Sequence, residues 1–273
     1  MTGGSEKRTD LLLAAPFFFC EDTVHPTPHR AADMKKRRAK RAKTPLKKRR
    51  STTHCPTQSY RLLTANRLPE ASGLAALAFA QSPCYVEIMP GSVQERVVFL
   101  DWMFSKNFLL RLDADCCRCT YNGQQLVCFF MFTKPGTRHP SLCDMLRVGL
   151  VAGLFAYGYS AVNRLLDTKN WFEKKEQDIL DARSAQSLGT EMIRLERMTV
   201  LPAFQGQGIG SSSLGKALKE ADDLGLPCIL GTQEEQNVRF YQKLGFEVVD
   251  KSLVPVGKGY TNWMMVREAQ HQT

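Results

Sequence analysis

The sequence predicts a mixed α/β (α+β) domain in which strands and helices both contribute to one core. Three observations predict this fold class. The hydrophobic content of 43% is enough to build a substantial core. The dipeptide Asn122-Gly123 joins two runs of strand-forming residues, which is the pattern of a β-hairpin. Further along, a strand-like run, a glycine-rich turn and a helix-like run follow one another between residues 192 and 224.

The first 58 residues differ in charge from the rest of the chain. They contain 14 Lys and Arg against 5 Asp and Glu, whereas the remaining residues contain 23 against 22. The net charge of +10 therefore lies almost wholly in this segment. We expect a disordered basic N-terminal arm at 1–58 and one folded domain at 59–273. Because that domain is nearly neutral, its charge does not indicate a specific nucleic-acid partner.

Two stretches of the arm resemble targeting signals. Basic clusters at both ends of Lys35–Arg50 resemble a bipartite nuclear-localisation signal, which a nuclear import receptor would bind. The alternative is a solvated tail that associates weakly with polyanions. Leu11–Cys20 has the length of a signal-peptide core but no small-residue cleavage site after it. The expected location is cytoplasmic or nuclear.

Neither a metal site nor a membrane span is expected. The nine cysteines are odd in number and irregular in spacing, which indicates a reducing compartment. The cluster Cys116-Cys117-x-Cys119 lacks a second pair at zinc-finger spacing, so buried strand cysteines are the better interpretation. Val148–Val162 is shorter than the ~20 residues that a membrane helix needs, so we expect a soluble protein.

From Tyr60 the pattern becomes that of a folded domain. Prolines near segment starts and apolar residues at helical spacing predict two helices before the hairpin. The expected elements are a strand at Tyr60–Thr64, helices at Pro69–Phe79 and Val93–Leu110, and strands at Asp115–Tyr121 and Gln125–Thr133. The region 135–190 contains a segment rich in Leu, Val and Ala, Ser141–Leu180, and predicts a helical insertion.

The strand–turn–helix unit follows the insertion. Met192–Leu201 predicts a strand that ends at Pro202. Strict alternation would place Arg194, Glu196, Met198 and Val200 on one side and Ile193, Leu195, Arg197 and Thr199 on the other. Apolar residues at helical spacing predict the helix, and Gly225 and Pro227 end it. The last expected elements are a strand at Cys228–Leu230, a helix at Asn237–Leu244, and strands at Phe246–Asp250 and Thr261–Arg267.

The glycine-rich turn, Gln205–Gly210, is a candidate anion site. Amide groups in the first turn of a helix have no intrahelical partner, and the helix dipole favours negative charge there. A phosphate-binding P-loop does not fit, since Gly215-Lys216 is followed by Ala217. A dinucleotide fingerprint does not fit either, because the glycine spacing differs and no acidic residue ends the next strand. A tight turn without a ligand remains the alternative.

Two motifs resemble the GNAT superfamily of N-acetyltransferases. The segment 200–210, which reads VLPAFQGQGIG, resembles its signature of Gln or Arg, two residues, Gly, one residue, and Gly or Ala, after Val-x-Pro. Tyr241, followed by Leu244-Gly245-Phe246, resembles the Tyr-x-x-Leu-Gly-Phe motif. Ala78–Pro83 and Trp263–Met265 are similar to the small-molecule, puromycin N-acetyltransferase-like group. The likeness extends over Tyr60–Arg267.

This resemblance implies a GNAT fold: a mixed, mostly antiparallel sheet of six to seven strands with helices on both faces, splayed at the strand that holds the cofactor. It also implies acetyl-coenzyme A as co-substrate, without a metal. The pantetheine arm would pair with that strand, and the pyrophosphate would bind the glycine-rich turn. The implied cofactor-binding residues are Met198, Thr199, Val200, Gln205, Gly206, Gln207, Gly208, Ile209, Gly210 and Asn237. The family commonly has its Asn seven residues before the Tyr, where this chain has Glu234, whereas Asn237 lies four residues before Tyr241.

The implied chemistry is direct attack of a primary amine on the thioester. A lysine-like amine has a pKa of ~10.4, so only about one in a thousand is neutral at pH 7 and a base is needed. Glu196 is the candidate base, and an ion pair with Arg194 or Arg197 is the alternative. Tyr241 occupies the family position that protonates the leaving thiolate, and core packing is the alternative. An unpaired N–H near Met198 would polarise the carbonyl.

Three functions fit these residues. The first is acetyl transfer to a small-molecule amine, with the insertion 135–190 as a wall of the substrate pocket. The second is a protein or histone lysine N-acetyltransferase, which only the basic arm favours. The third is a non-catalytic acyl-coenzyme-A-binding module. The puromycin N-acetyltransferase-like group often has His-Trp-Tyr where this chain has Glu191-Met192-Ile193, so acceptor binding is expected to differ.

Overall fold

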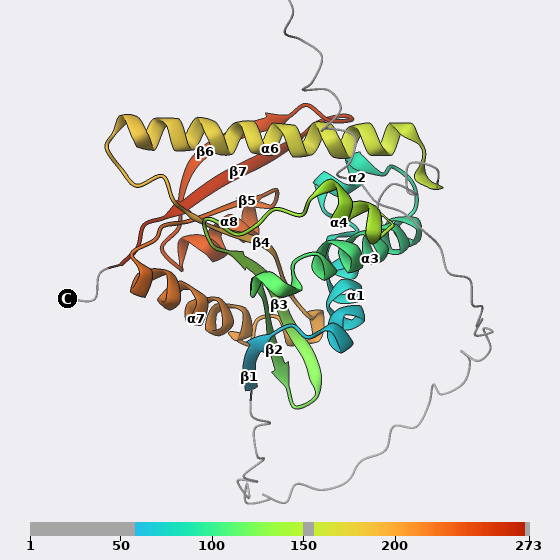
Figure 1. The fold of residues 1–273 in the computed structure, drawn as a ribbon, viewed down its shortest axis with the longest axis horizontal. Helices are drawn as coiled ribbons and strands as arrows, with labels where there is room; N and C mark the ends of the chain where they lie inside the picture. The colour runs from blue at the N-terminus through green and yellow to red at the C-terminus, as the bar shows by residue number, and fades with distance from the viewer. Residues whose placement is uncertain (1–57, 150–155, 271–273) are drawn as a thin grey trace, which may run out of the picture.

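The computed structural model describes residues 58–149 and 156–270, and Figure 1 shows their arrangement. The predicted arm 1–58, apart from its last residue, lies outside this range. So do the two segments that resemble targeting signals, Lys35–Arg50 and Leu11–Cys20. The apolar stretch Val148–Val162 is described only in part.

One seven-stranded sheet organises the described residues. Its order is β1-β2-β3-β4-β5-β7-β6, and its strand pairs are antiparallel except β4 with β5. The strands are β1 (Gln58–Leu62), β2 (Cys117–Asn122), β3 (Gln125–Thr133), β4 (Ile193–Val200), β5 (Cys228–Thr232), β6 (Glu247–Val254) and β7 (Tyr260–Arg267). The prediction of a mixed, mostly antiparallel sheet is confirmed.

Helices cover both faces of the sheet, as predicted. They are α1 (Leu68–Phe79), α2 (Pro83–Ile88), α3 (Val93–Leu109), α4 (Leu142–Arg147), α6 (Tyr159–Ala185), α7 (Ile209–Leu224) and α8 (Glu235–Gln242). Short 3-10 turns lie at Ala65–Arg67, Leu112–Ala114 and Pro202–Phe204. On one face, α1 and α3 pack against β2 and β3, and α6 packs against β5 and β7. On the other face lie α7 and α8.

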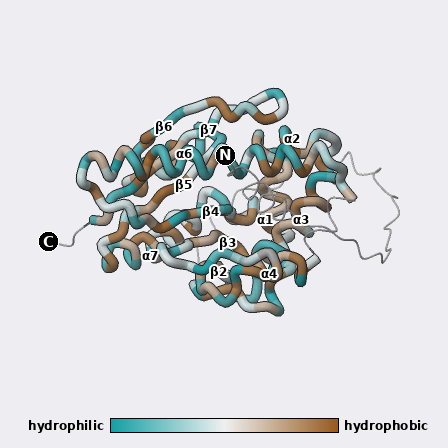
Figure 2. Tube along the Cα trace, turned by 45° about the horizontal axis from the view of Figure 1, so that its top comes forward, coloured by the Kyte–Doolittle hydropathy of each residue, from teal (hydrophilic) through white to brown (hydrophobic). Residues whose placement is uncertain are grey.

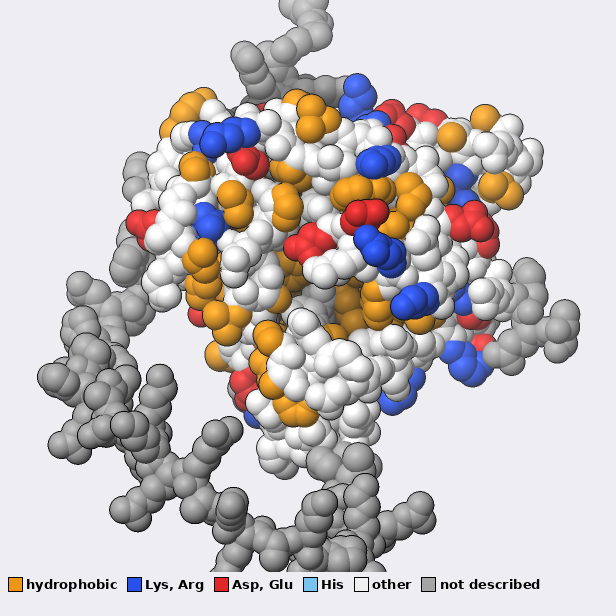
Figure 3. Space-filling model, turned by 180° about the vertical axis from the view of Figure 1, so that it is seen from behind, with side chains coloured by type: hydrophobic (Ala, Val, Ile, Leu, Met, Phe, Trp, Pro, Cys, Tyr) orange, Lys and Arg blue, Asp and Glu red, His pale blue; other side chains and the backbone are white. Residues whose placement is uncertain are grey.

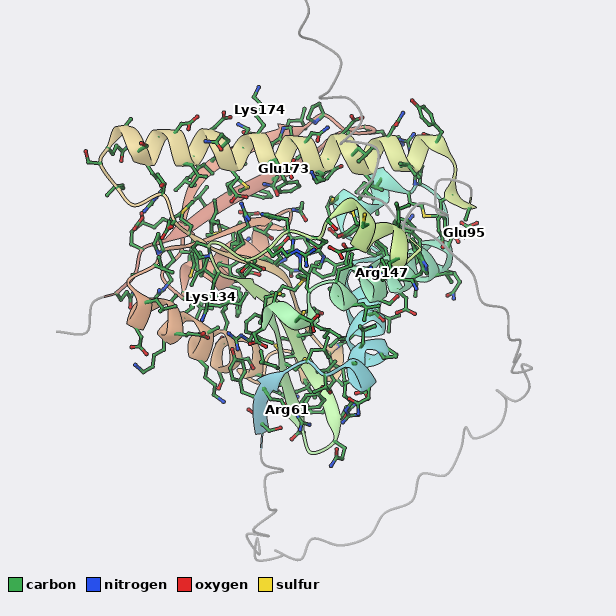
Figure 4. All side chains as sticks on the ribbon, viewed as in Figure 1. Arg61, Glu95, Lys134, Arg147, Glu173 and Lys174 are labelled. Atoms are coloured by element: carbon green, nitrogen blue, oxygen red, sulfur yellow. The ribbon has the colours of Figure 1, made fainter. Side chains whose placement is uncertain are left out.

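The region between β3 and β4 differs from the single helical segment expected at Ser141–Leu180. It contains the short helix α4 and the long helix α6, which lies across β6 and β7 in Figure 1. Helix α6 is amphipathic, and teal and brown alternate along it in Figure 2. Pairs of less exposed residues recur along it at Trp171-Phe172, Lys175-Glu176 and Ile179-Leu180, while Lys174 projects away from the sheet (Figure 4).

Helix α2 was not anticipated. Its six residues are too few for a periodic pattern, but Pro83 at its start and the two buried residues Cys84 and Ile88 fit a helical turn packed on a core. It packs against α6 and β7 through a small cluster with Val254 and Tyr260. The helix therefore closes the gap between the α1–α3 half and the α6 half of one face of the sheet.

The surface and the cysteines add three observations. The face shown in Figure 3 is hollowed near its centre, and hydrophobic side chains gather around the hollow. The seven cysteines within the described ranges are free thiols, and no group of three potential metal ligands occurs in those ranges. Across the same residues, no helix has the length and apolar character needed to cross a membrane.

Candidate active site

The central strands β4 and β5 separate along their length. In the described sheet they pair only over their first residues, Ile193–Arg194 with Cys228–Ile229, although β4 continues to Val200 and β5 to Thr232. Gly231 is exposed in spite of its place in a central strand. Backbone N–H and C=O groups on the two facing edges are therefore free to pair with an extended ligand. This is the splay that the sequence resemblance implied.

A β-bulge interrupts β4 at the splay. Met131 of β3 pairs with Glu196, and Phe129 pairs with Thr199. Arg197–Met198 therefore lie opposite a single residue of β3. Arg197 has φ = +53°, in the left-handed region that residues with a side chain seldom adopt. The extra residue shifts the alternation of every side chain that follows it.

This shift corrects the predicted facing of Glu196. Met198 and Val200 pack with α7 and α8, on the same face as Leu195. Glu196 is paired with Met131, which belongs to the cluster under α1 and α3. The expectation that Glu196 and Met198 share a face is therefore wrong, because strict alternation assumes a strand without a bulge. The two residues flank the splay from opposite sides.

The glycine-rich turn connects β4 to the start of α7. Gly206 and Gly208 have φ values of +72° and +77°, and a Cβ atom on either would meet open space. No side chain caps the N-terminus of α7. The first amide groups of this helix therefore have neither an intrahelical nor a side-chain acceptor and lie beside the splay, ready for an anion.

Close packing of α7 on β4 depends on Gly210. A Cβ at this position would lie 3.2 Å from Val200 Cγ2 and 3.4 Å from Met198 Cε. The side chains of Gln205 and Gln207 turn back on the loop and donate to the carbonyl oxygens of Val200 (3.0 Å) and Ala203 (2.9 Å). These two glutamine side chains hold the loop, and its backbone provides the groups for a ligand.

Tyr241 lies on α8 and is buried in the cluster under α7 and α8. Its ring packs edge-on against Phe240 and Phe246, with centroid distances of 5.1 and 5.7 Å. Burial raises the pKa of Tyr241 far above its ordinary value, so the phenol keeps its proton at neutral pH. Asn237 lies one turn earlier on the same side of α8 and is half-buried.

The carboxylate of Glu196 is 39% exposed and has Arg197 as its cation. Arg197 Nη1 lies 3.3 Å from Glu196 Oε1. Arg194, the other expected partner, instead donates to Glu176 of α6. One of the two predicted ion pairs is therefore formed, and it is long for a charge-assisted hydrogen bond, which normally spans about 2.7–2.9 Å.

Helix α6 covers the face of the splay on which Glu196 lies. Phe172 packs over Gly231 so closely that a Cβ there would lie 2.8 Å from the ring. Ion pairs fasten the same helix to the sheet, Glu176 with Arg194 and Lys175 with Asp250. The ring of Phe172 therefore lies directly over β5 where this strand separates from β4.

Several polar groups in this part of the fold lack partners of good geometry. The amide of Asn262 is fully buried, and it accepts a hydrogen bond from Gln233 (2.7 Å) through Oδ1 while Nδ2 has no acceptor. The hydroxyls of Thr168, Thr199 and Tyr260 are buried without a hydrogen bond of good geometry. Such groups are costly unless a ligand or water satisfies them, so they mark a candidate polar site.

The sequence analysis identified the glycine turn, Tyr241 and Glu196, but not the other residues on the face of the splay that α6 covers. These are Tyr85, Phe172, Arg197, Tyr260 and Asn262. All of them lie outside the two recognised motifs. The orientation of Arg197 depends in addition on the bulge in β4. For Phe172, the sequence does contain a local signal, since residues that recur in pairs along α6 mark one side of the helix. That pattern does not show which part of the fold this side contacts.

The fold and part of the sequence are similar to known acetyltransferases. Residues 169–248 match the model of the acetyltransferase (GNAT) domain. The structure resembles a Drosophila melanogaster polyamine N-acetyltransferase that forms N-acetylagmatine, with a TM-score of 0.53, 13% identity, and coverage of 78% of this chain and 100% of that one. It also resembles arylalkylamine N-acetyltransferase 2 from Aedes aegypti, with a TM-score of 0.52, 12% identity, and coverage of 78% and 99%. At these identities the structural likeness shows a shared fold.

Proposed function

We propose that this chain, which carries a GNAT acetyltransferase domain, transfers the acetyl group of acetyl-coenzyme A to a primary amine of a small molecule. The observation that carries the proposal is the splay between β4 and β5 beside an uncapped, glycine-led helix. An extended amide chain and a diphosphate need those two features side by side.

The residues around the splay fit acetyl-coenzyme A. The free edge of β4 at Met198–Val200 offers backbone groups to the amides of the pantetheine arm. Amide groups of Gly206–Gly210 would donate to the pyrophosphate, and the open space beside Gly206 and Gly208 leaves room for it. Bound acetyl-coenzyme A supplies the acetyl thioester for transfer.

The two candidate catalytic side chains lie on opposite faces of the sheet, which suits two separate proton transfers, one from the amine and one to the leaving sulfur. Glu196, on the face covered by α6, is the proposed base for the incoming ammonium group. Tyr241, on the face of α7 and α8, stays protonated because burial raises its pKa, and it is the proposed donor to the leaving sulfur. An N–H of the bulge near Met198 is the proposed donor to the carbonyl oxygen.

The cover formed by α6 favours a small acceptor over a protein lysine. Helix α6 is fastened to the sheet through Glu176 and Lys175, and Phe172 packs directly on β5. An extended peptide would need a groove over this face, and the helix occupies that position. The alternative of protein or histone lysine acetylation therefore has no support from the described residues beyond the shared chemistry.

The first test measures thiol release from acetyl-coenzyme A with polyamines, aminoglycosides, amino acids and histone peptides as acceptors. We expect turnover with at least one small amine and much slower turnover with the peptides. Saturable coenzyme A binding without turnover on any amine would instead indicate the non-catalytic module. No affinity for any acyl-coenzyme A would refute the proposal altogether.

The second test addresses the base. Glu196→Gln keeps the size of the side chain and removes its ability to take a proton, so kcat should fall by about 100-fold or more. Glu176→Gln is the matched control, because it removes a carboxylate on the same face that is already paired with Arg194. Equal kcat values for the two variants would remove Glu196 from the mechanism.

A further inference from the structure

Arg197 combines an unusual backbone with an incompletely paired charge. It occupies the bulge of β4 at φ = +53°, a conformation that costs free energy for any residue with a Cβ. Strain of this kind persists only where the surrounding structure enforces it, and it is concentrated at functional sites. The bulge turns the Arg197 side chain toward the core under α1 and α3, next to Glu196.

The surroundings of the Arg197 guanidinium are mainly aromatic and sulfur-containing. The group lies over the ring of Phe104 (5.6 Å to the centroid), and Nη1 approaches Met131 Sδ at 3.6 Å. The phenol of Tyr85 is its other polar neighbour besides Glu196, and burial raises the pKa of Tyr85 to about 12 although Arg197 opposes that effect. A cation in such surroundings is costly to desolvate unless it is well paired.

The guanidinium is not well paired. Of its five N–H donors, those on Nη1 serve Met131 and the long contact to Glu196, the Tyr85 phenol accepts a further hydrogen bond, and the buried Nε has no acceptor. Two arginines that are more deeply buried than Arg197 are satisfied on several sides. Arg267 binds Asp222 through both Nη atoms, at 2.7 and 2.9 Å, and Arg96 donates to three backbone carbonyls. The Nε side of Arg197 therefore remains without an acceptor oxygen.

Three other carboxylates on this side of the sheet are engaged. Glu176 binds Arg194, Asp250 binds Lys175, and Glu87 accepts from the backbone N–H of Lys258 at 2.7 Å. Glu196 has a weaker partner than these three carboxylates, and the proposed reaction uses it for the amine. None of the three is free to bind the second ammonium group that a polyamine carries.

We propose that Arg197 binds a carboxylate of the acceptor, so that the acceptor is an amine that also carries a carboxylate, such as an amino acid or an ω-amino acid. The inference rests on the proposed acetyl transfer and names its substrate class. A guanidinium edge offers two parallel donors, which match the two oxygens of a carboxylate. The amine would then lie near Glu196, the neighbour of Arg197 in the chain.

The test compares pairs of acceptors that differ by one carboxylate. Suitable pairs are phenylalanine with phenethylamine, lysine with cadaverine, and 6-aminohexanoate with pentylamine. For each pair the ratio of kcat/KM values is measured with wild type and with Arg197→Gln. The intrinsic pKa of each amine cancels from the comparison, because both enzymes meet the same two amines. Arg194→Gln, a change of an ion-paired arginine on the same strand, is the matched control.

We expect wild type to prefer the carboxylate-bearing member of at least one pair. Arg197→Gln should lower that preference by about 10- to 100-fold, the range for a lost charge-assisted pair, whatever happens to its absolute rate. Arg197→Lys should keep only part of the wild-type preference, since an ammonium group lacks the two parallel N–H donors of a guanidinium. Arg194→Gln should keep the wild-type ratio.

Two results would overturn the inference while leaving acetyl transfer intact. One is turnover of the carboxylate-free amines with equal or higher kcat/KM in wild type. The other is the same ratio in wild type and Arg197→Gln. If coenzyme A causes no thermal shift and no acceptor releases thiol, the proposed function itself has failed, and that outcome is distinguishable from the other two. If Arg197→Gln does not fold, the comparison is made with Arg197→Lys.

Discussion

Gly231→Ala tests how closely α6 covers the splay. An added Cβ would lie 2.8 Å from Phe172 Cε1, 3.3 Å from Met264 Sδ and 3.5 Å from Asn262 Nδ2. Carbon atoms pack best at about 3.5–4.0 Å, so the ring must retreat by roughly 1 Å. Gly231 has no positive φ, so the backbone tolerates alanine and the cost is steric.

Overpacking of this kind costs about 1–3 kcal/mol. A loss of about 2 kcal/mol would lower Tm by roughly 4–8 °C in a domain of this size. The measurement is thermal unfolding of wild type, Gly231→Ala, Phe172→Leu and the double variant. Because leucine frees the space that the new methyl group needs, the two changes should compensate, with a coupling of about 1–2 kcal/mol.

Two outcomes would refute this reasoning. If Gly231→Ala unfolds at the wild-type temperature, α6 does not press on the splay as described. If the losses for Gly231→Ala and Phe172→Leu simply add, the contact between the two positions does not limit stability. The same four proteins should also differ in acceptor choice, with Phe172→Leu accepting bulkier amines, which thiol-release assays would detect.

Three further predictions follow from individual residues. Gly208→Ala places a side chain in the left-handed region at a cost of about 1–2 kcal/mol and should weaken coenzyme A binding by roughly tenfold. Gly215→Ala, whose added Cβ meets open space within α7, is the control and should leave the coenzyme A affinity measured by calorimetry unchanged. Tyr241→Phe keeps the ring contacts and should lower kcat by about 100-fold at unchanged coenzyme A affinity; an unchanged rate would leave Tyr241 a packing residue. Partial desolvation raises the pKa of Asp222, but hydrogen bonds from Arg267 and Gln270 outweigh it and hold this pKa below its usual value. The contacts of the Asp222 carboxylate therefore stabilise the fold above about pH 4, and this stabilisation is lost as the pH falls through the lowered pKa. Asp222→Asn should abolish that part of the acid dependence in urea unfolding curves, and identical curves would contradict the assignment.

Local patterns predicted most of the fold. Hairpin strands β2 and β3 follow from Asn122-Gly123, and α7 follows from its apolar repeat and its glycine ends, because both depend on neighbours in the chain. Within its described residues the insertion contains helices α4 and α6, and its composition did not show where these helices begin and end. Helix α2 was missed because it is too short for periodicity to show.

The residues of the candidate site also divide into those that local sequence predicts and those that depend on tertiary contacts. The sequence by itself determined the glycine turn and the position of Tyr241, since each belongs to a contiguous motif whose backbone conformation is local. Only the tertiary structure decided which face Glu196 and Arg197 take, because the bulge in β4 depends on register with β3. It also decided that Phe172 covers Gly231. A helix pattern shows which side of a helix is apolar, but the partner of that side is chosen by contacts between residues far apart in the chain.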